Sequence, residues 1–179
     1  MKKIIAGICY FGYYLFARHL PGSDLPYSLG SKYIRRFFVR GMFKKCGRGV
    51  NIERGAFFGS GREIEIGDYS GLGLNCRVSG PLKIGRDVMM GPGVMIFTQN
   101  HGTDDLSIPM RLQTAPKHGV TIGDGVWIGA NALIMPGVNI GRGSIIGGGA
   151  VVTKDVPDMA VAAGNPARVI KYRGEQVRV

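Results

Sequence analysis

Aliphatic residues recur at every sixth position in the second half of the chain. A period of six matches neither the helical repeat nor the alternation of an ordinary strand. It is typical of a chain that forms a short flat strand, turns and starts again, so that three sides make one triangular coil. Glycine follows most of these anchors and suits the corners, because it adopts tight-turn conformations without steric cost. The inward-pointing anchors are Ile122, Ile128, Ile134, Ile140, Ile146 and Val152.

The same spacing extends through the first half of the chain. It begins loosely at Ile52, slips by two residues near Ile64 and then continues regularly from Ile66 to Ile96. A slip of two residues leaves the same side chains pointing inward and outward, because side chains in a strand alternate with a period of two. After Ile96 the spacing stops, and it returns out of phase at residue 122. We therefore predict four or more stacked coils and an inserted loop, which is a common place for function on a rigid scaffold.

The first 49 residues lack the six-residue spacing and carry most of the positive charge. Ten lysines and arginines face one aspartate there, whereas the rest of the chain contributes little to the net charge of +11. No recognised nucleic-acid-binding motif accompanies this charge, so nucleic acid is not an expected partner. An apolar run over residues 4–17 is shorter than the about 20 residues that span a membrane, and it predicts a packed or interfacial helix.

A second helix is predicted over residues 32–45, with Ser31 as its N-cap. Ile34, Phe37 and Phe38 share one face of this helix, and basic residues crowd the others. The simplest expectation is that the apolar face packs on the repeat body. The alternative is that this basic amphipathic helix lies on an anionic membrane surface, so that a cytoplasmic protein becomes peripheral at the inner membrane face.

The cysteines and histidines give no sign of a metal site. Three cysteines stand at unrelated spacings, which provide neither a disulfide framework nor a metal-binding motif, and reduced thiols in a cytosolic protein are expected. A zinc enzyme built on this repeat would need three histidines on facing coils. Only His101 and His118 lie in the right region, so no metal is expected.

His101 is the leading candidate for chemistry because it opens the inserted loop beside the rigid coil. A neutral imidazole titrates near neutral pH and can act as general base for an alcohol. A solvated histidine is the alternative for His101 and the favoured reading for His118. Trp127 directly precedes an inward anchor and is therefore expected on the outer surface of a coil.

The end of the chain is expected to close the repeat with a helix. Asn165 followed by Pro166 suits a helix start, with asparagine as the cap and proline at the first helical position. We predict a short helix over residues 166–173. The expected organisation is thus a basic, partly helical arm, a β-helix with its inserted loop, and a capping helix with a tail, at residues 1–49, 50–164 (loop 97–121) and 165–179.

The motifs VWIG, VVTKDVP and GNPARVIK resemble those of the hexapeptide-repeat acetyltransferases. The nearest resemblance is to sugar O-acetyltransferases of the galactoside, maltose and polysaccharide-modifying kind, and it covers about residues 64–173. The resemblance implies a mainly β fold, a left-handed parallel β-helix. It also implies a homotrimer that binds acetyl-CoA in the cleft between neighbouring subunits.

The resemblance also assigns residues. His101 matches the catalytic histidine of the family. Where galactoside-type members carry an acceptor-binding asparagine, this chain has Gly73, so Asn75 and Asn100 are the remaining candidates for acceptor contacts. The positions that match contacts to the acetyl-CoA pantetheine arm, phosphates and nucleotide are Trp127, Ala130, Gly148, Thr153, Lys154, Arg168 and Lys171.

The function expected from these features is direct acetyl transfer from acetyl-CoA to a hydroxyl of a sugar or polysaccharide precursor, which would be a small-molecule or lipid-linked acceptor. His101 would be the general base. Two alternatives stay open. An N-acetyltransferase that acts on an amino sugar would use the same base, and a non-catalytic β-helix scaffold would use the repeat only for assembly.

Overall fold

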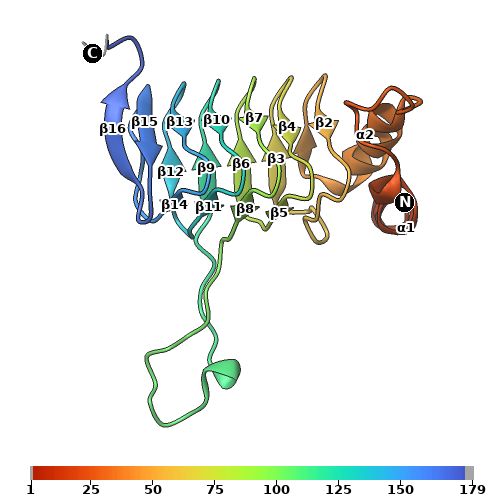
Figure 1. Ribbon diagram of the computed structural model, residues 1–179. Helices are drawn as coiled ribbons and strands as arrows, with labels where there is room; N and C mark the ends of the chain where they lie inside the picture. The colour runs from red at the N-terminus through yellow and green to blue at the C-terminus, as the bar shows by residue number, and fades with distance from the viewer. Residues whose placement is uncertain (1, 176–179) are drawn as a thin grey trace.

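The computed structural model describes residues 2–175 and has the expected mainly β architecture (Figure 1). Two helices lie at one end of a parallel β-helix, and short strands follow one another along its axis. The prediction of a hexapeptide β-helix is confirmed. The arm contains α1 (Lys2–Leu15), the short turn η1 (Ala17–His19) and α2 (Ser31–Met42).

The strands are short, mostly two or three residues, as a six-residue repeat requires. The first half contains β1 (Lys45–Cys46), β2 (Asn51–Ile52), β3 (Ile64–Ile66), β4 (Gly71–Leu72), β5 (Arg77–Val78), β6 (Leu82–Ile84), β7 (Met89–Met90) and β8 (Met95–Ile96). The second half contains β9 (Val120–Ile122), β10 (Trp127–Ile128), β11 (Leu133–Ile134), β12 (Asn139–Ile140), β13 (Ile145–Ile146), β14 (Val151–Val152), β15 (Ala160–Ala163) and β16 (Arg168–Tyr172).

These strands stack into three faces. One face has the order β1-β3-β6-β9-β12, the second β16-β15-β13-β10-β7, and the third β14-β11-β8-β5, while β2 and β4 pair in a separate two-stranded sheet. In the regular coils each anchor pairs with the anchor three hexads later, as Ile66 does with Ile84 and Ile122 with Ile140. Because β1 already pairs with β3, the β-helix begins before residue 50, inside the segment expected to form the arm.

Two departures from this register confirm the slip and the insertion. Ile52 pairs with Leu72, two positions further along than a regular coil allows, so the first coil absorbs the slip. Ile84 pairs with Ile122, and the coil between them therefore contains the inserted loop. The loop occupies residues 97–119, slightly shorter than predicted, because β9 begins at Val120.

The core of the β-helix is the ladder of anchors. Each predicted anchor is buried except Met90, which is half-buried and packs against the core. The small residues two positions before the later anchors are buried as well, which brings the three faces together around a narrow axis. Burial of one such aliphatic side chain stabilises the fold by about 1.5–3 kcal/mol. The small inward residues are Val126, Ala132, Val138, Ser144 and Ala150.

The arm packs on the first coil, but of the apolar face predicted for α2 only Phe38 packs against the core. Arg35 and Val39 are fully buried, whereas Phe37 is 69% exposed and Ile34 is 36% exposed. Ser31 is not the N-cap, because the helix is capped by Gly30 in the left-handed conformation and the Ser31 hydroxyl donates to the Pro21 carbonyl oxygen at 2.7 Å. Among residues 2–175, no helix is both long and apolar enough to cross a membrane.

Arg35 is buried where carbonyl groups from distant segments accept hydrogen bonds from its Nε and Nη1 atoms and a carboxylate lies near its Nη2 atom. It donates to the carbonyl oxygens of Ile52 and Pro21, the latter at 2.9 Å, and its Nη2 atom lies 3.6 Å from the Glu53 carboxylate. Burial lowers the pKa of Arg35 and acts to raise that of Glu53. The pKa of Glu53 is nevertheless lowered, because hydrogen bonds from Ser23 and Asn51 and the Arg35 charge outweigh burial.

The C-terminal end is closed by a strand, and the predicted capping helix is wrong. Arg168–Tyr172 forms β16, which pairs antiparallel with β15 after a turn that contains a cis peptide bond between Asn165 and Pro166. Val169 and Ile170 are β-branched and favour a strand. The pairing also covers an edge of β15 that would otherwise leave backbone groups free to pair with another chain. Residues 176–179 of the predicted tail lie outside the described residues.

Candidate active site

The inserted loop leaves the third face after β8, extends sideways from the β-helix and returns to β9 (Figure 1). Its two limbs are joined near the base, where the His118 amide donates to the Thr98 carbonyl oxygen at 2.7 Å. The Thr98 hydroxyl donates to the Gly80 carbonyl oxygen at 2.6 Å, which fixes the base to the preceding coil. Near the tip, the Gln113 side chain bonds the backbone of Asp105. The loop is therefore an ordered projection.

His101 lies on the outgoing limb of this loop and is exposed, as is the neighbouring Asn100. The position suits an imidazole that must meet a ligand from outside its own coil. In the same loop, the Asp105 carboxylate accepts hydrogen bonds from the Ser107 hydroxyl and amide at 2.6 and 2.8 Å. Those hydrogen bonds lower the pKa of Asp105.

Trp127 lies on the outer surface of β10, as predicted, and its side chain is 49% exposed. It stands in the register between Met89 of β7 and Ile145 of β13. Ala130 and Gly148 occupy the stacked corners that follow, and the Gly149 amide donates to the Ala130 carbonyl oxygen at 2.8 Å. We call the surface formed by Trp127 and these small corner residues the Trp127 strip.

The basic residues assigned to the nucleotide end are exposed. Thr153 and Lys154 follow β14, and Arg168 and Lys171 lie on β16. Within the described part of the chain, none of these three cations forms an ion pair. Their positive charges are therefore available to an anionic group such as a phosphate.

One chain does not bring His101 onto the Trp127 strip. The loop leaves from β8, whereas Trp127 belongs to β10 in another sheet. The loop also extends away from the β-helix that carries it (Figure 1).

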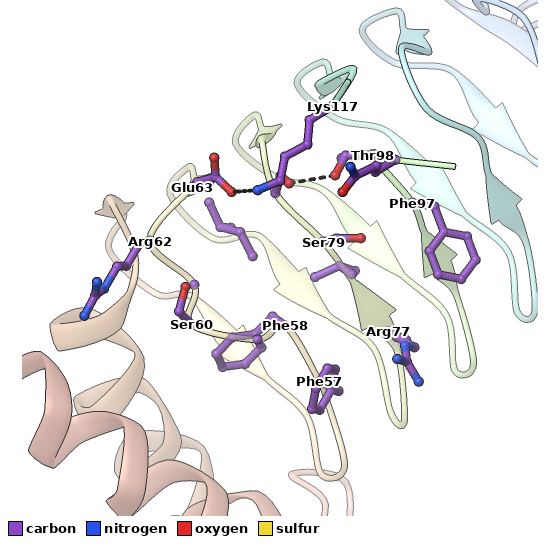
Figure 2. Close-up of a pocket in the computed structure, with 16 residues that line it drawn as sticks. Phe57, Phe58, Ser60, Arg62, Glu63, Arg77, Ser79, Phe97, Thr98 and Lys117 are labelled. Atoms are coloured by element: carbon purple, nitrogen blue, oxygen red, sulfur yellow. Dashed lines mark hydrogen bonds and ion pairs between the residues drawn. The ribbon is translucent and has the colours of Figure 1, made fainter. Parts of the chain in front are cut away.

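A pocket of about 390 Å³ lies at the base of the loop, and sequence analysis did not find it (Figure 2). Its mouth is bridged by an ion pair between Lys117 and Glu63. The Arg77 guanidinium lies 5.2 Å from the centroid of the Phe57 ring. Aromatic faces beside cations, acids and amides are typical of a site for a polar ring such as a sugar. The other side chains that line it include Phe58, Arg62, Ser79, Phe97, Thr98 and Gln99.

The structure separates Asn75 from this loop-base pocket. Asn75 adopts a left-handed conformation at a corner next to Gly55, and it lines a different pocket beside Arg18 and His19 of the arm. Gly73 is buried, and a Cβ atom there would collide with the Gly91 carbonyl oxygen of the next coil. This packing leaves no space for an asparagine side chain at residue 73.

Comparisons with known proteins match this architecture. Residues 119–154 match the model of a bacterial transferase hexapeptide with six repeats. Galactoside O-acetyltransferase of Escherichia coli is 36% identical over 162 residues, which are 86% of this chain and 78% of that protein. A structure of galactoside acetyltransferase in complex with coenzyme A superimposes with a TM-score of 0.77 at 28% identity, covering 96% of this chain and 80% of that one. A hexapeptide-repeat acetyltransferase of Vibrio cholerae complexed with acetyl coenzyme A gives a TM-score of 0.77 at 25% identity, covering 97% and 88%.

Proposed function

This chain belongs to the hexapeptide-repeat acetyltransferases, and on that premise we propose that it transfers an acetyl group from acetyl-CoA to a sugar hydroxyl. The observation that carries the proposal is an exposed imidazole on an ordered loop beside a polar, aromatic pocket. The coenzyme A complexes of the structural relatives support the donor. The galactoside O-acetyltransferase relative supports a sugar or a polysaccharide precursor as the acceptor.

His101 acts as the general base in this mechanism. It takes the proton of the acceptor hydroxyl while the oxygen attacks the thioester carbonyl carbon, and a backbone N–H stabilises the negative charge that develops on the carbonyl oxygen. The carbon–sulfur bond then breaks, and the imidazolium returns the proton to the departing thiolate. The products are the acetyl ester and free CoA.

The cysteines do not support a covalent acyl intermediate. Cys9 and Cys76 are buried, and burial raises the pKa of Cys76 to about 12. Burial also raises the pKa of Cys46, which is half-buried near the arm. Because the thiolate is the nucleophilic form, none of these groups is prepared for acyl transfer. Direct transfer to the acceptor is the simpler route.

The proposed assembly is a homotrimer in which the loop of one subunit lies against its neighbour. The tip of the loop exposes Leu106, Met110 and Leu112 at 97%, 63% and 57%. Clustered apolar side chains of this kind are typical of an interface. The loop would then carry His101 to the Trp127 strip of the neighbouring subunit. The exposed cations Lys154, Arg168 and Lys171 would bind the CoA phosphates.

The loop-base pocket is the proposed acceptor site, because it adjoins the limb that carries His101. Phe97 would contact the apolar side of a sugar, and Arg77, held over the Phe57 ring, and Gln99 would donate hydrogen bonds to its hydroxyls. A panel of acceptors with acetyl-CoA, scored by the release of CoA thiol, tests the proposal. We expect turnover with a sugar hydroxyl. Turnover only with amines, or no turnover with any sugar, would contradict it.

Arg77→Ala is expected to raise the KM for the acceptor about tenfold, because it removes a charged donor from the pocket. The KM for acetyl-CoA should stay within error of the wild type. Steady-state kinetics with each substrate varied in turn measure both constants. Arg86→Ala is the matched control, since Arg86 is exposed on another face and pairs with Asp124. An unchanged acceptor KM in Arg77→Ala would place the acceptor elsewhere.

A further inference from the structure

The outer side of α1 carries an unbroken apolar stripe. Ile4, Ile8, Phe11 and Leu15 are spaced by four, three and four residues, which places them on one helical face. They are exposed by 68%, 65%, 63% and 77%. The opposite face of α1, with Cys9 and Tyr13, is buried against the first coil and α2. This helix is therefore apolar on the side that faces solvent as well as on the side that faces protein.

The outer side of α2 is both aromatic and basic. Tyr33 and Phe37 are 56% and 69% exposed, and Arg36 and Arg40 lie beside them on the helix, Arg36 partly exposed and Arg40 exposed. The Arg36 guanidinium lies 5.2 Å from the centroid of the Tyr33 ring. This face is opposite the buried one, so it points away from the β-helix.

The two stripes belong to helices that pack against each other. α1 and α2 lie against each other because two glycines allow close approach, with Gly12 against the Phe38 ring and Gly41 against Cys9. Each helix buries one face toward the first coil and turns its stripe to the opposite side. Both helices lie at the end of the β-helix (Figure 1). We call the combined outer stripes of α1 and α2 the arm surface.

We propose that the arm surface docks on an anionic lipid bilayer. Apolar side chains from α1 would enter the interface between head groups and acyl chains, while the cations of α2 would contact lipid phosphates. The charge favours this occupant, because α2 carries Lys32, Arg36 and Arg40 at its surface and neither helix contains an acidic residue. A second copy docked through the same surface would place two strongly basic faces together, which is unfavourable.

This orientation leaves the proposed active site accessible. The arm surface lies at one end of the β-helix, and the loop leaves sideways from its middle (Figure 1). The loop would remain in water at a fixed height above the bilayer. The inference goes beyond the proposed function and specifies where the reaction takes place, on an acceptor presented at a membrane surface.

Co-sedimentation of the full-length protein with vesicles tests the inference. One set of vesicles contains phosphatidylcholine mixed with phosphatidylglycerol, and the other contains phosphatidylcholine alone. We expect the wild type to pellet with the anionic vesicles, and added salt to weaken this binding because it screens exposed charges. Wild-type protein that stays in the supernatant with anionic vesicles would overturn the inference.

Two variants separate the contributions of charge and apolar contact. Arg36→Gln/Arg40→Gln is expected to lower partition into anionic vesicles about thirtyfold, from the usual contribution of each cation near a charged surface. Phe11→Ser/Leu15→Ser is expected to lower it at least about tenfold through lost apolar burial. Lys83→Gln/Arg86→Gln removes the same number of charges from the β-helix and should bind like the wild type.

The remaining outcomes are decisive as well. Equal pelleting of the wild type and both arm variants would overturn the inference. A change in oligomer size caused by Phe11→Ser/Leu15→Ser, measured by light scattering without lipid, would overturn it too, because the stripe would then contact another subunit. Acetyl transfer to a water-soluble acceptor should be unchanged in both arm variants, so failure of the docking inference is distinguishable from failure of the proposed function.

Discussion

His101→Ala is expected to lower kcat by about 10²- to 10⁴-fold, the usual contribution of a positioned general base. The side chain is exposed on the loop, so its removal leaves no cavity and should not change the stability of the β-helix. Acetyl-CoA should still bind, because the Trp127 strip and the exposed cations are intact. Steady-state kinetics and a thermal-shift titration with acetyl-CoA measure the two effects separately.

His118→Ala is the matched control for this variant. His118 lies in the returning limb of the same loop and is exposed, and it holds the base of the loop through its backbone amide and carbonyl, which the substitution keeps. We expect its kcat to stay within about twofold of the wild type, as for most exposed substitutions without a role. If His101→Ala turns over as fast as His118→Ala, His101 is not the base.

Arg35→Ala is expected to lower the free energy of unfolding by about 3 kcal/mol, because it leaves a partly buried carboxylate without its cation. Three backbone carbonyl groups, of Leu20, Pro21 and Ile52, also lose a donor. The arm should therefore detach from the first coil more readily than in the wild type. Urea denaturation followed by circular dichroism measures the change.

Arg36→Ala provides the comparison for Arg35→Ala. Arg36 is the next residue on α2, is partly exposed and stacks on Tyr33 without an ion pair among the described residues. Loss of the Arg36 side chain should lower the free energy of unfolding by less than about 1 kcal/mol, as for other exposed cation–π contacts. Equal destabilisation by the two variants would show that the buried network around Arg35 does not hold the arm.

The architecture could be predicted from the sequence because each hexad encodes one strand, one corner and one inward anchor. This period also located the two-residue slip and the inserted loop, since Ile52 and Ile84 pair with partners beyond the regular distance. A local pattern of this kind predicts a fold reliably when every repeat indicates the same structure. The outward position of Trp127 followed from the same alternation.

The features that failed depend on contacts between distant segments. Helical spacing placed Ile34 and Phe37 on the packing face, but Arg35 is buried instead because the chain around Pro21 and Ile52 supplies carbonyl oxygens to it. The tail became a strand because pairing with β15 outweighed a sequence that resembles a helix start. Such tertiary effects override local propensity and leave no mark on the periodicity.

The loop-base pocket was missed for a related reason. Phe57, Arg77 and Lys117 come from the first coil, the second coil and the returning limb of the loop. Phe57 lies beside Arg77 because the slip changes the stacking register there. Sequence analysis detected the slip but did not use it to align the outward side chains of the two coils. Aligning the two coils with the slip included would have placed Phe57 beside Arg77.

In the proposed trimer, each active site combines His101 of one subunit with the Trp127 strip of the neighbouring subunit. This arrangement is tested most directly by mixing two inactive variants, His101→Ala and Gly148→Phe. Gly148 is exposed and does not require the left-handed conformation, so the added ring should fill the Trp127 strip without unfolding the coil. Each variant alone should form trimers that do not turn over.

In trimers assembled from equal amounts of the two variants, about one subunit interface in four places an intact His101 beside an intact Trp127 strip. The account therefore predicts that mixed trimers recover about a quarter of the wild-type kcat. Mixed trimers of confirmed composition that remain as inactive as the parent variants would contradict it.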